Sequence, residues 1–174
     1  VFSFVANPGD RVYAATMTNS SASSTDSVLE LLSTDGTTVI ESDDDNGSLS
    51  TTSSVIAGAV IPAGNPAGST YYLRVKTLSS TSRMPPYQMH VRILSGAPDA
   101  ENEGGAGLPP DNNTTPNAYP LPASKWVAGT LASADTIDLY AVTVAAGHTI
   151  VAFADADPDR DNVDTPLQVG IGPI

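Results

Sequence analysis

The chain has 174 residues, enough for one large or two small domains, and its 40% hydrophobic content is enough to build a core. Nineteen acidic and seven basic residues give a formal net charge of −12, so nucleic acid and anionic membrane surfaces are poor partners, whereas cations are good ones. The absence of cysteine excludes disulfides and thiolate metal sites, and no apolar run reaches the roughly 18 residues of a transmembrane helix.

The composition predicts an all-β protein. Charged residues make up only 15% of the chain, while Ser, Thr, Gly, Pro, Ala and Val are abundant, as is typical of β-sandwiches. No window keeps an apolar 3.6-residue period for three turns, so almost no helix is expected. Because the chain starts at Val1, in what reads as the middle of a strand, we expect a fragment or a processed chain.

The first two predicted strands flank a tight turn. Apolar and polar residues alternate over residues 1–5, the turn Pro8-Gly9-Asp10 follows, and the next strand runs over residues 12–15. This pattern predicts a β-hairpin.

A second hairpin is predicted over residues 28–40. Two β-rich runs, residues 28–32 and 37–40, are separated by a turn that contains Asp35-Gly36, and such turns need a positive φ that Asp and Gly tolerate. Further along, residues 71–76 and 87–93 alternate apolar with polar side chains. That period of two predicts strands with one buried and one solvated face.

The C-terminal part repeats the opening pattern. Residues 139–144, the turn Ala146-Gly147-His148 and residues 150–153 match the first strand, turn and strand when Gly147 is set on Gly9. Identities are few, but the shared order of strand, turn, strand, acidic loop and strand predicts a tandem repeat. The stretch from Ser95 to Pro122 has the Pro/Gly-rich composition of a linker.

Several short motifs follow one another in a characteristic order. They are Asp26-x-x-Leu29-x-Leu31, Asp35-Gly36, Asp43-Asp44-Asp45 with Gly47, Gly68-Ser-Thr-Tyr71-Tyr72-Leu73-Arg74-Val75 and Pro86-Tyr87-Gln-Met89. This order resembles the bacterial pre-peptidase C-terminal (PPC) domain family, which is related to the collagen-binding modules of clostridial collagenases. Members are small antiparallel β-sandwiches appended to secreted proteases and other exported proteins.

Together, the resemblance and the repeat imply two tandem antiparallel, jelly-roll-like sandwich modules. The first would span residues 1–96 and lack its first strand. Residues 97–110 would form the Pro/Gly-rich linker, and residues 111–174 the N-terminal part of a second module.

The most regular acidic run lies near the C-terminus. Alternating carboxylates across a loop can converge on one hard cation, because Ca²⁺ takes six to eight oxygen ligands. Arg160 stands where an EF-hand loop requires Gly and no Glu closes the loop, so a true EF-hand is not expected; the alternative is a solvated acidic turn. The predicted ligands are Asp155, Asp157, Asp159, Asp161 and Asp164.

Two other acidic groups are candidates for calcium. Asp43, Asp44 and Asp45, together with Asp26, must have their mutual repulsion relieved either by a cation or by backbone N–H groups in a capped turn. In the resembled family, calcium in the collagen-binding members is held by acidic residues near the start of the domain and in such loops. The linker acids are either solvated or hold an interdomain calcium: Asp99, Glu101, Glu103 and Asp111.

Catalysis finds no support in the sequence, so we expect that the chain is not an enzyme. Neither His90 nor His148 has a sequence context that suggests a nucleophile partner. Tyr72 and Trp126 could stack on sugars or collagen, or could simply belong to the core or cover a sheet edge. Sequons for N-glycosylation begin at Asn19, Asn46, Asn112 and Asn113.

The sequence therefore predicts a non-catalytic, calcium-stabilised extracellular module of a secreted or cell-surface prokaryotic protein. Its role would be substrate targeting or adhesion, with collagen or a polysaccharide as the extracellular polymer. The alternative is a structural subunit that self-associates through its sandwich edges into a filament or surface layer.

Overall fold

The computed structural model describes residues 1–17, 26–45, 52–81, 84, 86–101, 111–131 and 137–154. In these ranges the protein is all-β, as predicted, and the helical structure amounts to one 3-10 turn, Thr115–Asn117. No helix in this part of the chain has the length and apolar character needed to cross a membrane. The described residues form two compact units, one of residues 1–96 with 151–154 and the other of residues 97–150.

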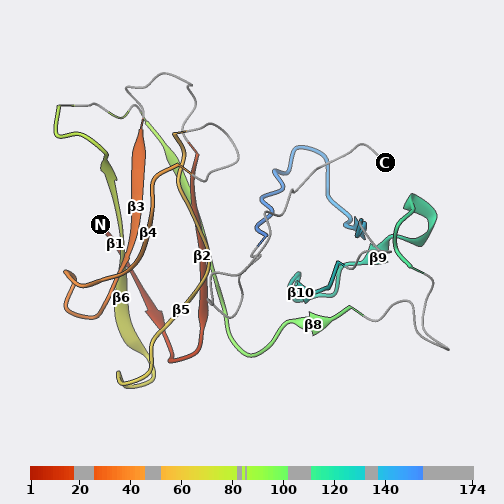
Figure 1. Ribbon diagram of the computed structural model, residues 1–174, viewed down its shortest axis with the longest axis horizontal. Helices are drawn as coiled ribbons and strands as arrows, with labels where there is room; N and C mark the ends of the chain where they lie inside the picture. Colours follow the sequence, from red (N-terminus) through yellow and green to blue (C-terminus); the bar gives the residue numbers. More distant parts are fainter. Residues whose placement is uncertain are drawn as a thin grey trace. The chain divides into compact units, whose positions relative to one another are not determined.

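The first unit contains seven described strands in two antiparallel sheets (Figure 1). The four-stranded sheet has the order β1-β6-β3-β4 and the three-stranded sheet the order β5-β2-β7. The strands are β1 (Phe2–Ala6), β2 (Arg11–Met17), β3 (Ser27–Leu32), β4 (Val39–Asp43), β5 (Val55–Val60), β6 (Ser69–Thr77) and β7 (Gln88–Leu94).

The two sheets pack face to face around one apolar core, the arrangement of a β-sandwich. Leu29 and Leu31 of β3, two residues apart, both point inward and expose none of their surface. From the opposite sheet, Val12 and Ile56 meet them and are equally buried. Each fully buried side chain of this size stabilises the fold by about 1.5–3 kcal/mol.

The predicted hairpin over residues 28–40 is confirmed: β3 pairs with β4 in antiparallel register, Leu29 opposite Asp43. Its loop is longer than a two-residue turn, because β3 ends at Leu32 and β4 begins at Val39. The Asp35 carboxylate accepts hydrogen bonds from the backbone N–H groups of Thr37 and Thr38, each at 2.8 Å, and Gly36 has a φ of 70°. Thr37 and Thr38 therefore belong to the loop, and the strand starts at Val39.

The predicted hairpin around Pro8-Gly9-Asp10 is wrong. β1 pairs with β6 in one sheet and β2 pairs with β5 and β7 in the other, so this turn carries the chain across the sandwich. The crossing is held by Ile61, whose N–H donates to Asp10 O at 2.8 Å and whose carbonyl accepts from Gly9 N at 2.9 Å. A tight-turn motif indicates a chain reversal but does not specify which sheet the next strand joins.

The described part of the second unit contains short parallel strand pairs instead of antiparallel sheets. β8 (Asp99–Ala100) pairs in parallel with β10 (Val127–Ala128), and β9 (Tyr119–Pro120) pairs in parallel with β11 (Tyr140–Ala141). Among its described residues no apolar side chain is buried, whereas Asn112 is only 2% exposed. The tandem repeat, the linker and a second antiparallel sandwich stay predictions.

Candidate functional site

Backbone pairing in the second unit brings three distant segments together. Glu101 N donates to Ala128 O at 2.9 Å, which places the Glu101 side chain beside Gly129. Leu139 N donates to Asn112 O at 3.2 Å, which places Asn112 next to the segment that carries Asp138. The Asn112 amide Nδ2 in turn donates to Glu101 Oε1.

Side-chain oxygens of these segments converge at Gly129. The position that a Cβ atom on Gly129 would occupy lies 2.8 Å from Tyr140 Oη and 3.2 Å from Asp138 Oδ2, and closer still to Glu101 Oε2. Only a glycine leaves this space open. Two carboxylates and a phenol oxygen thus meet at one point, and we call Glu101, Asp138, Tyr140 and Gly129 the oxygen cluster.

Burial raises the free-energy cost of placing two carboxylates close together. Oxygens of Glu101, Asn112, Asn113 and Asp138 are shielded from solvent, and Asn113 Oδ1 has no hydrogen-bond partner among the described residues. Carboxylates that are close together and partly desolvated repel one another. Carboxylate and amide oxygens are the kinds of ligand that suit a hard cation such as Ca²⁺.

The oxygen cluster contains only two acidic residues. No group of three or more His, Cys, Asp or Glu side chains in the described ranges is arranged to hold a metal ion. A cation at the oxygen cluster would therefore need the amide, phenol and backbone oxygens as ligands, and water for the rest of its coordination shell.

The acidic loop of the first unit is partly satisfied by the backbone. Asp43 Oδ2 accepts a hydrogen bond from Val55 N at 2.7 Å. Burial, followed by the charges of Asp45 and Asp44, raises the pKa of Asp26 above its usual range. Asp26 Oδ1 is buried without a hydrogen-bond partner among the described residues. Asp26, Asp43, Asp44 and Asp45 are thus neighbours, but no three of these carboxylates are arranged to hold a metal ion.

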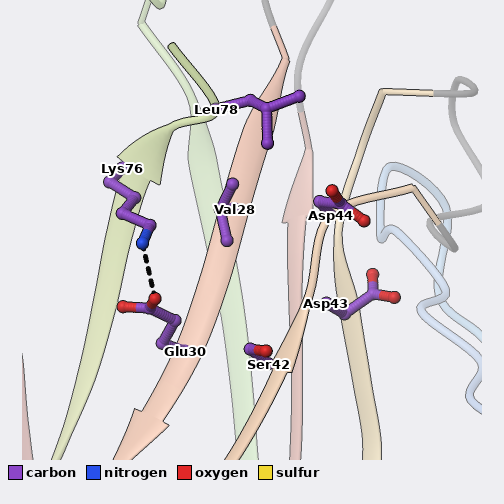
Figure 2. A pocket seen from close by; sticks show the side chains of 7 residues that line it. All are labelled: Val28, Glu30, Ser42, Asp43, Asp44, Lys76 and Leu78. Atoms are coloured by element: carbon purple, nitrogen blue, oxygen red, sulfur yellow. Dashed lines mark ion pairs between the residues drawn. The ribbon is translucent and has the colours of Figure 1, made fainter. Parts of the chain in front are cut away.

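A pocket of about 280 Å³ opens beside this loop. Figure 2 shows the Glu30–Lys76 ion pair across it, with Asp43 and Asp44 on the β4 side. Glu30 is 5% exposed, and its carboxylate lies 2.6 Å from Lys76 Nζ and 2.5 Å from Arg74 Nε. Burial alone would raise the pKa of Glu30, but hydrogen bonds from Arg74 and Lys76, with their charges, lower it below the usual range. The deepest acid of the pocket is therefore held ionised in a structural ion-pair network.

A buried hydroxyl network supports the loop. Thr16 Oγ1 and Ser27 Oγ are 2.8 Å apart, and Ser27 Oγ lies 2.7 Å from Ser54 Oγ. Thr16 is on β2 and Ser27 on β3, so the network joins the two sheets next to Asp43 and Asp44. Polar residues at alternating positions of a strand are usually interpreted as solvent-facing, so no pattern in the sequence predicts this network.

The aromatic residues predicted to contact a ligand lie in different units. Tyr72 is half-buried on β6, and its ring lies 3.7 Å from where a Cβ atom on Gly36 would be, so it covers the loop of the hairpin. Trp126 is half-buried just before β10, and its carbonyl accepts from Asp99 N at 3.0 Å. His90 is half-buried on β7 and His148 is exposed in a turn.

Some predicted site residues lie outside the described residues. These are Asp155, Asp157, Asp159, Asp161, Asp164, Glu103, Asn19 and Asn46. Of the other two sequons, Asn112 is buried and bonded to Glu101, so it is not accessible to a glycosylating enzyme, and Asn113 is half-buried.

The sequence pointed to one member of the oxygen cluster and missed the others. Glu101 was among the linker acids, but nothing in the linear pattern placed it beside Asp138 and Tyr140. The available signal was Gly129, directly after Val127 and Ala128, together with the acid-rich segments on either side.

Comparisons with protein-family models, with curated proteins and with solved structures found no match for this chain.

Proposed function

We propose that this protein is a non-catalytic, calcium-stabilised extracellular module of a secreted or cell-surface prokaryotic protein, used for substrate targeting or adhesion. The observation that carries the proposal is the convergence of Glu101, Asp138 and Tyr140 oxygens on Gly129. Such a site ties distant segments together, which is what a structural cation does.

The described residues of the second unit form no apolar core that could stabilise it. A cation at the oxygen cluster would remove the repulsion between Glu101 and Asp138 and join the segments of β8, β10 and β11. A ligand that binds only the folded state stabilises it by about 2.7 kcal/mol at a hundredfold excess over its Kd. That is a large share of the stability of a small domain.

The PPC family remains our proposed affiliation, supported by the antiparallel sandwich of the first unit. An extracellular polymer, collagen or polysaccharide, is the partner that this affiliation implies. Tyr72 and Trp126 are the aromatic candidates for contact with it, because each retains some exposed surface.

The proposal is tested by calorimetric titration of Ca²⁺ into chelator-treated protein. We expect saturable binding, with Mg²⁺ binding more weakly because it demands a smaller, near-octahedral site. Absence of any calcium-dependent heat, with an unchanged circular dichroism spectrum, would contradict calcium stabilisation. Hydrolysis of generic peptide or ester substrates by the pure chain would contradict the non-catalytic assignment.

A structural subunit of a filament or surface layer is the alternative function. It is favoured by one specific observation, the exposed apolar residues on the edge strand β1. A filament requires a head-to-tail contact that does not close.

A further inference from the structure

The strand β1 forms one end of the four-stranded sheet. It pairs with β6 over five consecutive residues without a register shift, from Phe2 opposite Leu73 to Ala6 opposite Ser69. In an antiparallel ladder, alternate residues of an edge strand direct their N–H and C=O groups away from the sheet. No described strand pairs with that outer side of β1.

The other three edges of the sandwich carry features that discourage pairing. β4 contains Glu41 and Asp43, and its register with β3 is shifted near one end. β7 contains Arg92. β5 is uncharged, but Gly58 breaks its regular backbone with a φ of 77°, and Arg11 Nη1 donates to the Gly58 carbonyl at 3.1 Å. Charges, bulges and covered carbonyls are the usual means by which proteins protect sheet edges.

β1 has none of these protections. Its sequence Phe-Ser-Phe-Val-Ala contains no charge, proline or glycine, and no bulge interrupts it. Apolar side chains at this edge are open to solvent: Val5 is 62% exposed, Phe2 47% and the adjacent Val1 75%. A regular, uncharged, apolar edge strand is a template for pairing with another strand.

Charge favours a second copy of this chain as the partner. The chain carries a net charge of −12, yet β1 and its neighbour β6 contain no carboxylate, and the cations of β6, Arg74 and Lys76, are paired with Glu30 of β3. Two copies can therefore approach at this edge without bringing acidic residues into contact. Two identical uncharged strands are also self-complementary when they pair antiparallel around a two-fold axis.

We propose that β1 is a dimerisation edge: β1 of one copy pairs antiparallel with β1 of a second copy, joining their four-stranded sheets into one continuous sheet. This contact is isologous and closes at the dimer, unlike a filament contact. It does not rest on the calcium site, which lies in the second unit.

The experiment is sedimentation velocity of the full chain over a concentration series, in calcium and in chelator. The test variant is Val5→Lys, because lysine on an edge strand opposes pairing. The matched control is Leu78→Lys, since Leu78 is also exposed, at 56%, but lies beyond β6 and outside β1. We expect a monomer–dimer equilibrium in the native chain and in Leu78→Lys, and at least a tenfold weaker dimer in Val5→Lys.

Hydrogen exchange tests the same pairing without a substitution, in case Val5→Lys fails to fold. The β1 amides should gain protection as concentration rises, while the β7 amides, on a protected edge, should not. A native chain that stays monomeric at all concentrations would overturn the proposal. So would a dimer that Val5→Lys leaves intact, open-ended polymers, or protection that rises equally in both strands.

Discussion

At the residue scale, the absence of one side chain creates the candidate calcium site. Gly129 is exposed and lies outside any strand, so its identity is not required by the packing of an apolar core. The space beside its Cα is shared by oxygens of Glu101, Asp138 and Tyr140. A methyl group there would collide with the oxygens of Glu101 and Tyr140 or force the segments apart, so any ligand shared by the three oxygens depends on this glycine.

The substitutions Glu101→Gln and Asp138→Asn test the roles of the two carboxylates. Each replaces a charged ligand with a neutral oxygen, so we expect calcium affinity to fall at least tenfold in either variant, measured by calorimetric titration. In chelator the same variants should be at least as stable as the native chain, because the substitution removes carboxylate repulsion. A substitution that weakens calcium binding but does not lower stability in chelator indicates a metal site. A purely structural role would lower stability in chelator as well.

Asp111→Asn is the matched control for these variants. Asp111 is exposed and belongs to the same unit, but no oxygen of its side chain belongs to the oxygen cluster. Its calcium affinity should equal that of the native chain. If all three variants bind calcium equally well, the cluster is not the site, and the acidic run from Asp155 to Asp164 becomes the leading candidate.

At the element scale, the β3–β4 hairpin shows how one carboxylate organises a loop. Hydrogen bonds from the Thr38 hydroxyl and from the backbone of Thr38 and Thr37 hold the pKa of Asp35 well below the usual range of a carboxyl group. Because the backbone N–H groups of Thr37 and Thr38 donate to Asp35, these two residues belong to the loop, and β4 begins at Val39. The conformation of the loop therefore depends on an ionised Asp35.

The hairpin should lose stability in acid. Because the folded-state pKa of Asp35 is lower than its unfolded-state value, its contribution is fully present above about pH 4 and is lost as pH falls below that value. Asp35→Ala should lower the melting temperature slightly at neutral pH and flatten its decline in acid. Thermal unfolding followed by circular dichroism between neutral and acidic pH measures both effects.

Thr38→Val provides the intermediate case for Asp35. It removes the hydroxyl donor to the carboxylate but keeps the backbone donors, so its acid-dependent decline should lie between those of the native chain and Asp35→Ala. Identical pH profiles for all three proteins would show that Asp35 does not stabilise the hairpin.

At the scale of the whole molecule, the two units are stabilised by different means. The first has a continuous apolar core between two sheets, with Leu29, Leu31, Ile56 and Tyr71 fully buried. In the second, the described residues place polar oxygens rather than apolar side chains in the interior. Solvent conditions that change metal binding should therefore change the stability of the second unit.

Differential scanning calorimetry should resolve two unfolding transitions. Calcium should raise the temperature of one and leave the other unchanged, because the apolar core of the first unit does not depend on a cation. Adding excess chelator should reverse the shift. If calcium raises both transitions, the cluster of Asp26 with Asp43, Asp44 and Asp45 binds calcium as well; if it raises neither, the stabilising role is contradicted.

The sequence by itself determined the fold class and most strands of the first unit, but it gave no prediction of β5 (Val55–Val60). Apolar alternation in residues 71–76 and 87–93 identified β6 and β7, and Asp35-Gly36 identified the β3–β4 hairpin, because these signals depend only on neighbouring residues. The same local character explains the error at Pro8-Gly9-Asp10: a turn motif specifies a reversal, and the choice between the two sheets depends on residues far along the chain.

Only the tertiary structure decided which polar residues meet. Glu101 reaches Gly129 through the pairing of β8 with β10, and Asp138 and Tyr140 come from a third segment near β11. Likewise, Thr16, Ser27 and Ser54 form one network only because the two sheets face each other. Such clusters depend on contacts between segments remote in sequence, and these contacts arise from the packing of the whole fold rather than from any local pattern.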